Sequence, residues 1–125
     1  MKRRGAIKKL LESGVVKSGS VDEHLKLLNG ISRKYSKARL DKEVKILKSL
    51  SDPARLKIIK ALTEREMCVC ELEYIFEQSQ PTISYHLKFL ESANILKRRK
   101  QGKWSLYSIA NGRVTRLLKD VDLIL

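Results

Sequence analysis

The chain has 125 residues, a length that suits one compact domain with a short additional segment. It carries 27 Lys and Arg against 14 Asp and Glu, giving a formal net charge of +13, and 42% of its residues are hydrophobic. A balance this basic favours a polyanionic partner, usually nucleic acid, although a surface charged for solubility is the alternative. No run approaches the ~20 apolar residues of a membrane-spanning helix, and two cysteines cannot form a disulfide framework. We therefore expect a soluble, cytoplasmic protein with no membrane partner.

The positive charge is concentrated in two segments. Residues 1–40 hold 11 basic and 3 acidic side chains, and residues 96–110 hold 5 basic and none acidic, whereas residues 41–95 are close to neutral. A charge kept only for solubility would be spread more evenly. The distribution predicts a basic, helical N-terminal extension over residues 1–40 and a separate domain over residues 41–125.

The N-terminal extension contains two helical patterns. A short helix is expected over about 6–13, and Ser20 to Glu23 form a capping box before a helix over about 21–28, which Asn29-Gly30 would end. His24 is expected on the surface of that helix, and residues 32–39 form a linker or the start of the next helix. Leucines in these helices favour an extended dimer interface, with some non-specific attraction for DNA.

The remaining elements follow one another closely. Helices are expected over about 40–50, from the Asp52 cap and Pro53 to Leu62, over about 71–77, and from the Ser79 cap to Ser92; residues 67–70 are expected to be extended. Two short helices joined by a three-residue turn predict a helix-turn-helix. Strands over about 95–101 and 103–109 then form a hairpin, and Asn111 caps a last helix with a large apolar stripe.

The second helix of a helix-turn-helix fits the major groove of DNA and offers polar side chains to the bases. Its candidate contacts are Gln80, Thr82, Ser84, Tyr85, His86 and Lys88; the alternative is an ordinary solvated helix face. The hairpin follows as a wing whose cations can meet phosphates, namely Lys97, Arg98, Arg99, Lys100 and Lys103. Trp104 and Tyr107 are expected to anchor this wing to the core.

Four stretches in this order and spacing resemble the arsenical-resistance repressor (ArsR-type) family: Leu47–Leu56, Glu66–Leu72, Ser79–Leu87 and the hairpin through Tyr107. The resemblance covers residues 44–110. It implies a mainly α winged helix-turn-helix with a small β-hairpin, and a homodimer in which residues 111–125 pack across the two-fold axis. It also implies a pseudo-palindromic double-stranded operator and repression that an inducer relieves.

Cys68 and Cys70 are the candidate sensor, because thiolates bind thiophilic ions. Cysteines at i and i+2 point apart on a helix but to the same side of an extended segment, so they can chelate one ion only if that segment is not helical. A following helix N-terminus should also lower the thiol pKa. The resemblance implies an As(III) or Sb(III) site here, with Glu73 where some members have a third cysteine, so the third sulfur would come from outside the chain.

Two other roles for these cysteines stay open: a redox pair, and two buried small side chains with no sensing function. The N-terminal segment has no cysteine and the last helix has no histidine, which argues against the cadmium-, lead- and zinc-type sites that the resemblance would otherwise imply. No obligatory cofactor is expected.

The sequence thus predicts a DNA-binding repressor released from its operator by a thiophilic ion at Cys68 and Cys70. The alternatives are a thiol redox-sensing regulator and a constitutive DNA-binding protein with no effector. An RNA-binding module is disfavoured because the paired-aromatic and Gly-rich signatures are missing. The absence of a nucleophile–base pair, a phosphate loop and a metal-hydrolase motif predicts that the chain is not an enzyme.

Overall fold

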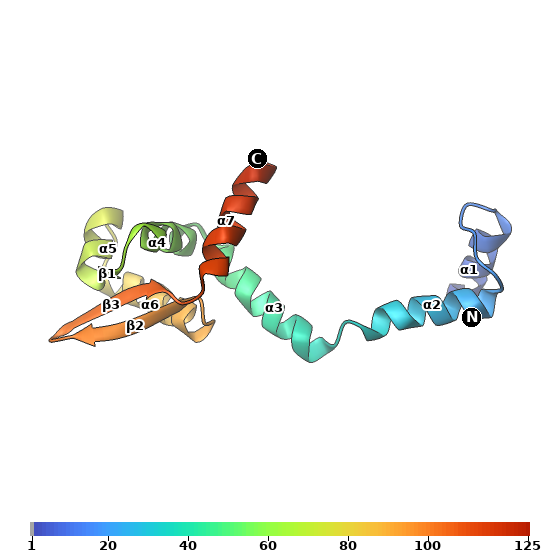
Figure 1. The fold of residues 1–125 in the computed structure, drawn as a ribbon, viewed down its shortest axis with the longest axis horizontal. Coiled ribbons are helices and arrows are strands. Elements are labelled where there is room, and N and C mark those ends of the chain that lie inside the picture. The colour runs from blue at the N-terminus through green and yellow to red at the C-terminus, as the bar shows by residue number, and fades with distance from the viewer. Residues whose placement is uncertain (1) are drawn as a thin grey trace. The chain divides into compact units, whose positions relative to one another are not determined.

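The computed structural model describes residues 2–125, and Figure 1 shows its fold. Seven helices and three strands follow in the order α1 (Lys2–Glu12), α2 (Val21–Arg33), α3 (Lys37–Leu50), α4 (Pro53–Glu64), β1 (Met67–Cys68), α5 (Val69–Phe76), α6 (Gln80–Ser92), β2 (Leu96–Gln101), β3 (Trp104–Ile109) and α7 (Gly112–Ile124) among these residues. The chain divides into two compact units, Met1–Asp41 and Lys42–Leu125. Within residues 2–125, no helix has the length and apolar character needed to cross a bilayer.

The helix starts follow the capping residues of the sequence. The Ser20 side chain accepts a hydrogen bond from the backbone N–H of Glu23, and the Glu23 carboxylate accepts one from the Ser20 N–H, which completes the predicted capping box. Asp52 and Asn111 cap α4 and α7 in the predicted way. The cap at Asp52 holds the pKa of its carboxyl below the ordinary value, mainly through the hydrogen bond from the Arg55 N–H.

Two expectations for the N-terminal unit were wrong. Helix α2 continues past Asn29-Gly30 to Arg33, because one glycine inside a helix costs only about 1 kcal/mol relative to alanine. His24 is only 7% exposed and therefore belongs to the interior of this unit rather than to its surface.

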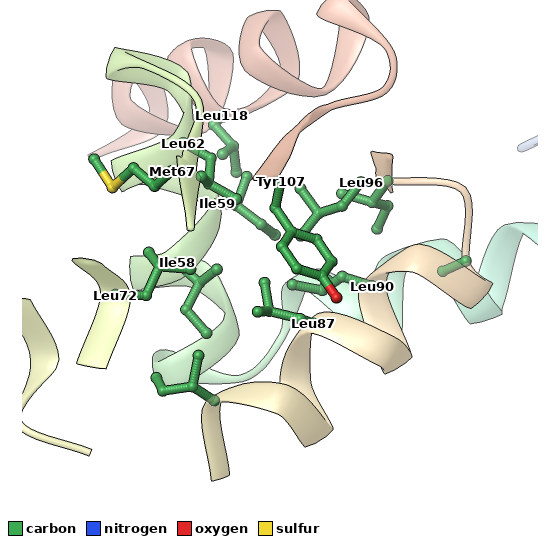
Figure 2. Packing of buried hydrophobic residues seen from close by; sticks show 13 residues of the cluster. Ile58, Ile59, Leu62, Met67, Leu72, Leu87, Leu90, Leu96, Tyr107 and Leu118 are labelled. Carbon is green, nitrogen blue, oxygen red and sulfur yellow. The ribbon is translucent and has the colours of Figure 1, made fainter. Parts of the chain in front are cut away.

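The core of the second unit joins its helices to the hairpin. Its largest fully buried side chains come from α4, α5, α6 and the segment after α6, namely Ile58, Ile59, Leu72, Ile83, Leu87, Leu90 and Ile95. Figure 2 shows Tyr107 of β3 directed into this cluster close to Leu87 and Leu90, with Leu118 of α7 reaching the same cluster. Tyr107 therefore anchors the hairpin as predicted, whereas Trp104 is 50% exposed and does not.

The sheet has three antiparallel strands in the order β1-β3-β2. The expected hairpin is formed by β2 and β3, with Leu96 opposite Ile109 and Gln101 opposite Trp104. Gly102 at its tip has φ +61°, a left-handed conformation that glycine adopts without steric cost. Strand β1 adds the third strand, since Cys68 lies opposite Leu106. Helices α4, α5 and α6 with this projecting hairpin form a winged helix-turn-helix (Figure 1).

Candidate DNA-binding interface and cysteine pair

Helix α6 is held by its cap and by its apolar face. The Ser79 side chain accepts a hydrogen bond from the Thr82 N–H, and the two hydroxyl oxygens lie 2.9 Å apart. Ile83, Leu87 and Leu90 are fully buried beneath the helix. Because these residues fix one face against the core, the opposite face is presented to solvent.

That outer face carries most of the residues predicted to read DNA. Gln80, Ser84 and Lys88 follow one another at intervals of four along α6, and the Gln80 amide donates a hydrogen bond of 2.9 Å to the Ser84 hydroxyl. Tyr85 lies beside this row and is 61% exposed. Thr82 is half-buried and engaged with the cap. The face therefore offers an amide, a hydroxyl, a phenol and an ammonium group within three turns.

His86 differs from the other predicted contacts. Its ring is half-buried, and its Nδ1 is buried without a hydrogen-bond partner among residues 2–125. The ring meets Tyr85 edge-on and lines a cavity of about 340 Å³ between α4 and α6, together with Lys57 and Glu77. His86 thus sits at the border between the exposed face and the interior, and its contact with DNA stays a prediction.

The wing, defined here as the β2–β3 hairpin, contains all five predicted cations in exposed positions. Two of them are held within the domain. The Arg99 guanidinium donates hydrogen bonds of 2.8 and 2.6 Å to the two carboxylate oxygens of Glu66, and Arg98 lies 3.7 Å from a Glu91 oxygen. The Arg99 hydrogen bonds hold the pKa of Glu66 below its ordinary value.

The lysines of the wing are arranged differently. The Lys103 ammonium lies 5.0 Å from the centre of the Trp104 ring, a cation–π contact that leaves the charge at the tip of the hairpin. Lys97 and Lys100 are exposed along β2. The wing therefore presents lysine ammonium groups to solvent and uses its arginines largely to bind its own domain.

Cys68 and Cys70, called the cysteine pair from here on, lie at the junction of β1 and α5. Cys68 is the N-cap of α5 and has an extended backbone, whereas Cys70 lies in the first turn of the helix. Their Cα atoms are 5.5 Å apart and their sulfurs are joined in a disulfide. The expectation that residues 67–70 are all extended was wrong, because α5 begins at Val69; one extended residue before the helix is enough to bring the two sulfurs together.

Neighbouring charges fix the backbone of this junction. The Glu71 carboxylate accepts a hydrogen bond of 3.1 Å from the Cys68 N–H and lies 3.3 Å from the Arg65 guanidinium. Cys68 is 9% exposed, while Cys70 is exposed and accessible from solvent. Within residues 2–125, no group of three or more His, Cys, Asp or Glu side chains is arranged to hold a metal ion. The described residues thus supply two cysteine sulfurs and no third His, Cys, Asp or Glu ligand beside them.

An apolar surface lies between α3, α4 and α7. A cavity of about 350 Å³ is lined mainly by leucines, among them Leu47, Leu56 and Leu117, and also by Val121. Most of the predicted apolar stripe of α7 remains exposed there, since only Leu118 is buried. This surface matches the pattern of a helix that packs on another chain.

Sequence reasoning missed one ion pair and one exposed aromatic side chain of the second unit. Glu66 holds the wing through Arg99, a pairing across 33 residues for which an isolated sequence has no signal. Tyr74 on α5 is 87% exposed, and its position outside the 3.6-residue apolar pattern could have identified it.

Known proteins resemble this chain in sequence and fold. The pattern of the family described as "Bacterial regulatory protein, arsR family" matches residues 52–98. An uncharacterized HTH-type transcriptional regulator of Methanocaldococcus jannaschii is 44% identical over 85 residues, which cover 67% of this chain and 96% of that protein. An arsenical resistance operon repressor of Bacillus subtilis is 42% identical over 74 residues, 58% of this chain and 70% of that protein.

Among solved structures, the homodimeric winged helix-turn-helix DNA-binding domain of a possible ArsR-family regulator from Mycobacterium bovis superposes with a TM-score of 0.66. It is 28% identical, and the match covers 72% of this chain and 86% of that one. The helix-turn-helix, the wing and these similarities lead to one conclusion: the chain belongs to the arsR family of DNA-binding, winged helix-turn-helix transcriptional repressors.

Proposed function

We propose that this repressor leaves its operator when a thiophilic ion, As(III) or Sb(III), binds the cysteine pair. The observation that carries the proposal is the approach of the two sulfurs at the start of α5, the first helix of the helix-turn-helix. A bound ion would constrain the N-terminal turn of that helix and thereby alter the support of α6. The relative from Bacillus subtilis is named for arsenical resistance, which agrees with this inducer.

The chemistry requires the reduced pair. Two thiols condense with arsenious acid, forming two As–S bonds and releasing two water molecules, and the third hydroxyl remains on arsenic. A third thiol can replace that hydroxyl with release of one more water. Because residues 2–125 contain two cysteines and Glu73 stands where some family members have a third, we assign this third position to an external monothiol such as glutathione.

The test is a titration of labelled upstream DNA bound to the reduced protein, followed by fluorescence anisotropy. Arsenite should lower the affinity at least tenfold, and added glutathione should shift the titration to lower arsenite. The Cys68→Ser and Cys70→Ser variants should bind DNA like the parent chain and ignore arsenite. An arsenite response that persists in both variants would overturn the proposal, as would an unchanged affinity of the reduced parent chain.

The disulfide favours a second candidate function, thiol redox sensing. Hydrogen peroxide oxidises the two thiols to one disulfide and is itself reduced to two water molecules. Under this function, peroxide lowers operator affinity and a dithiol reductant restores it, while arsenite has no effect. A chain that ignores both reagents would instead be a constitutive DNA-binding protein.

We also propose a homodimer that packs through the apolar surface between α3, α4 and α7 and binds a pseudo-palindromic operator. The exposed stripe of α7 and the homodimeric relative support this assembly. In such a dimer the recognition helices would be about 34 Å apart, one turn of DNA. A Leu117→Glu variant should sediment as a monomer and lose operator binding, whereas an unchanged sedimentation coefficient would contradict this interface.

A further inference from the structure

The N-terminal unit folds with its cationic side chains exposed to solvent. Helices α1 and α2 pack against each other through half-buried apolar side chains, among them Leu10, Leu11 and Leu25, and His24 is buried with them. The cationic side chains of α1 from Arg3 onward are all exposed. The fold of this unit, here called the N-terminal basic hairpin (α1 and α2), therefore displays cations around a small apolar interior.

The carboxylates of the hairpin are largely engaged within it. Of the three acidic residues in residues 1–40, Asp22 accepts a hydrogen bond of 2.6 Å from Arg4, Glu23 accepts the N–H of Ser20, and Glu12 is exposed at the end of α1. Neither of the two engaged carboxylates is placed to neutralise Lys8 or Lys9, for which no ion pair is recorded among the described residues. The hairpin thus keeps a strong positive field at its surface.

We propose that the N-terminal basic hairpin is a second DNA-binding surface, which contacts the phosphodiester backbone of duplex beside the operator. Phosphate contacts require exposed cations and no base reading, and that is the chemistry α1 presents. Lys8 lies beside Gly5 at the rim of a hollow that Arg4, paired with Asp22, also lines, and the missing side chain of Gly5 leaves room for a phosphate to approach the helix backbone.

Covalent linkage to the helix-turn-helix and the wing strengthens this contact. Once α6 and the wing hold the operator, the N-terminal basic hairpin experiences a high local concentration of flanking phosphates, so individually weak contacts add to affinity. The family match begins at residue 52, so this surface lies outside the part shared with the family pattern. The competing partner is a second copy of the chain, because Leu27 and Ile31 of α2 are exposed.

The experiment compares two full-length triple variants with equal charge loss. Arg3, Lys8 and Lys9 become Gln in one, and Arg113, Arg116 and Lys119 on α7 become Gln in the other; all six side chains are exposed, and Gln keeps helix propensity close to that of Lys and Arg. The first variant should reduce the magnitude of the negative slope of log K against log salt by roughly 2.7 per protomer, since each lost phosphate contact contributes about 0.9. The control variant should change it by less than one.

A second readout separates the possible partners. The parent chain should bind an operator fragment of about 50 bp, which includes flanking duplex, at least tenfold more tightly than one of about 20 bp without flanks. The Arg3/Lys8/Lys9 variant should lose that advantage. An unchanged slope and length dependence would overturn the proposal. If that variant instead fails to dimerise, the surface binds a second copy; if it only loses binding to phosphatidylglycerol vesicles, the surface binds membranes.

Discussion

The distribution of ion pairs on the wing predicts which of its cations neutralise DNA phosphates. Lys97, Lys100 and Lys103 extend from the hairpin into solvent, whereas Arg99 is bound by both oxygens of Glu66. Replacing the three lysines with Gln should reduce the magnitude of the negative slope of log K against log salt by roughly 2.7 per protomer, at about 0.9 for each phosphate contact. Between about 50 and 200 mM salt, the affinity of the parent chain should then fall about 40-fold more, for each protomer bound, than that of the variant.

The matched control removes a charge pair instead of a single charge. A Glu66→Gln, Arg99→Gln double variant leaves the net charge of the domain unchanged, so its salt slope should equal that of the parent chain. Lys100→Gln, one residue away on β2, should lower the slope by about 0.9. Fluorescence anisotropy with one operator fragment over a series of salt concentrations measures both. A double variant that loses as much slope as Lys100→Gln would show that Arg99 binds phosphate, and the reasoning would be refuted.

Three further predictions concern stability. Asp52→Ala should destabilise the fold by about 1 kcal/mol through loss of the α4 cap. Because the pKa of Asp52 is lowered in the folded protein, urea unfolding should show the full difference from the parent chain above pH ~4 and a smaller difference as the pH falls through that lowered pKa. Leu87→Ala, at a site with no exposed surface, should cost 2–5 kcal/mol, roughly, by calorimetry, and a cost under about 1 kcal/mol would contradict the described core. Burial raises the pKa of Tyr107 above 10.0, so the parent chain should lose stability relative to Tyr107→Phe as pH rises from 10.0 towards the folded pKa.

Four helix starts were predictable because their signals are local, whereas α1 and α3 begin three to four residues before the expected positions. A cap residue and the N–H it accepts lie within three positions, so Ser20, Asp52, Ser79 and Asn111 identified the starts of four helices. The same locality identified the helix-turn-helix and the hairpin. The start of α5 was missed because its N-cap is Cys68, a residue outside the usual capping set, although Glu71 reaches back to the Cys68 N–H as in a capping box.

The features that depend on distant residues were not predictable in this way. Strand β1 is two residues long and exists only because Met67 pairs with Tyr107, 40 positions later. A strand so short has no periodicity of its own, so the sequence favoured an undivided extended segment. The Glu66–Arg99 pair has the same origin, because the sheet brings together two side chains that are otherwise unrelated in the chain.

These two sources of structure meet at the cysteine pair. Local capping starts α5 between the two cysteines, and the long-range pairing of Cys68 with Leu106 fixes the first of them in the sheet that also carries the wing. Leu106 in turn lies opposite Arg99 of β2, so one row across the sheet contains Cys68, Leu106 and the arginine bound by Glu66. Chemistry at the cysteine pair therefore acts where β1 joins the first helix of the helix-turn-helix to the sheet that contains the wing.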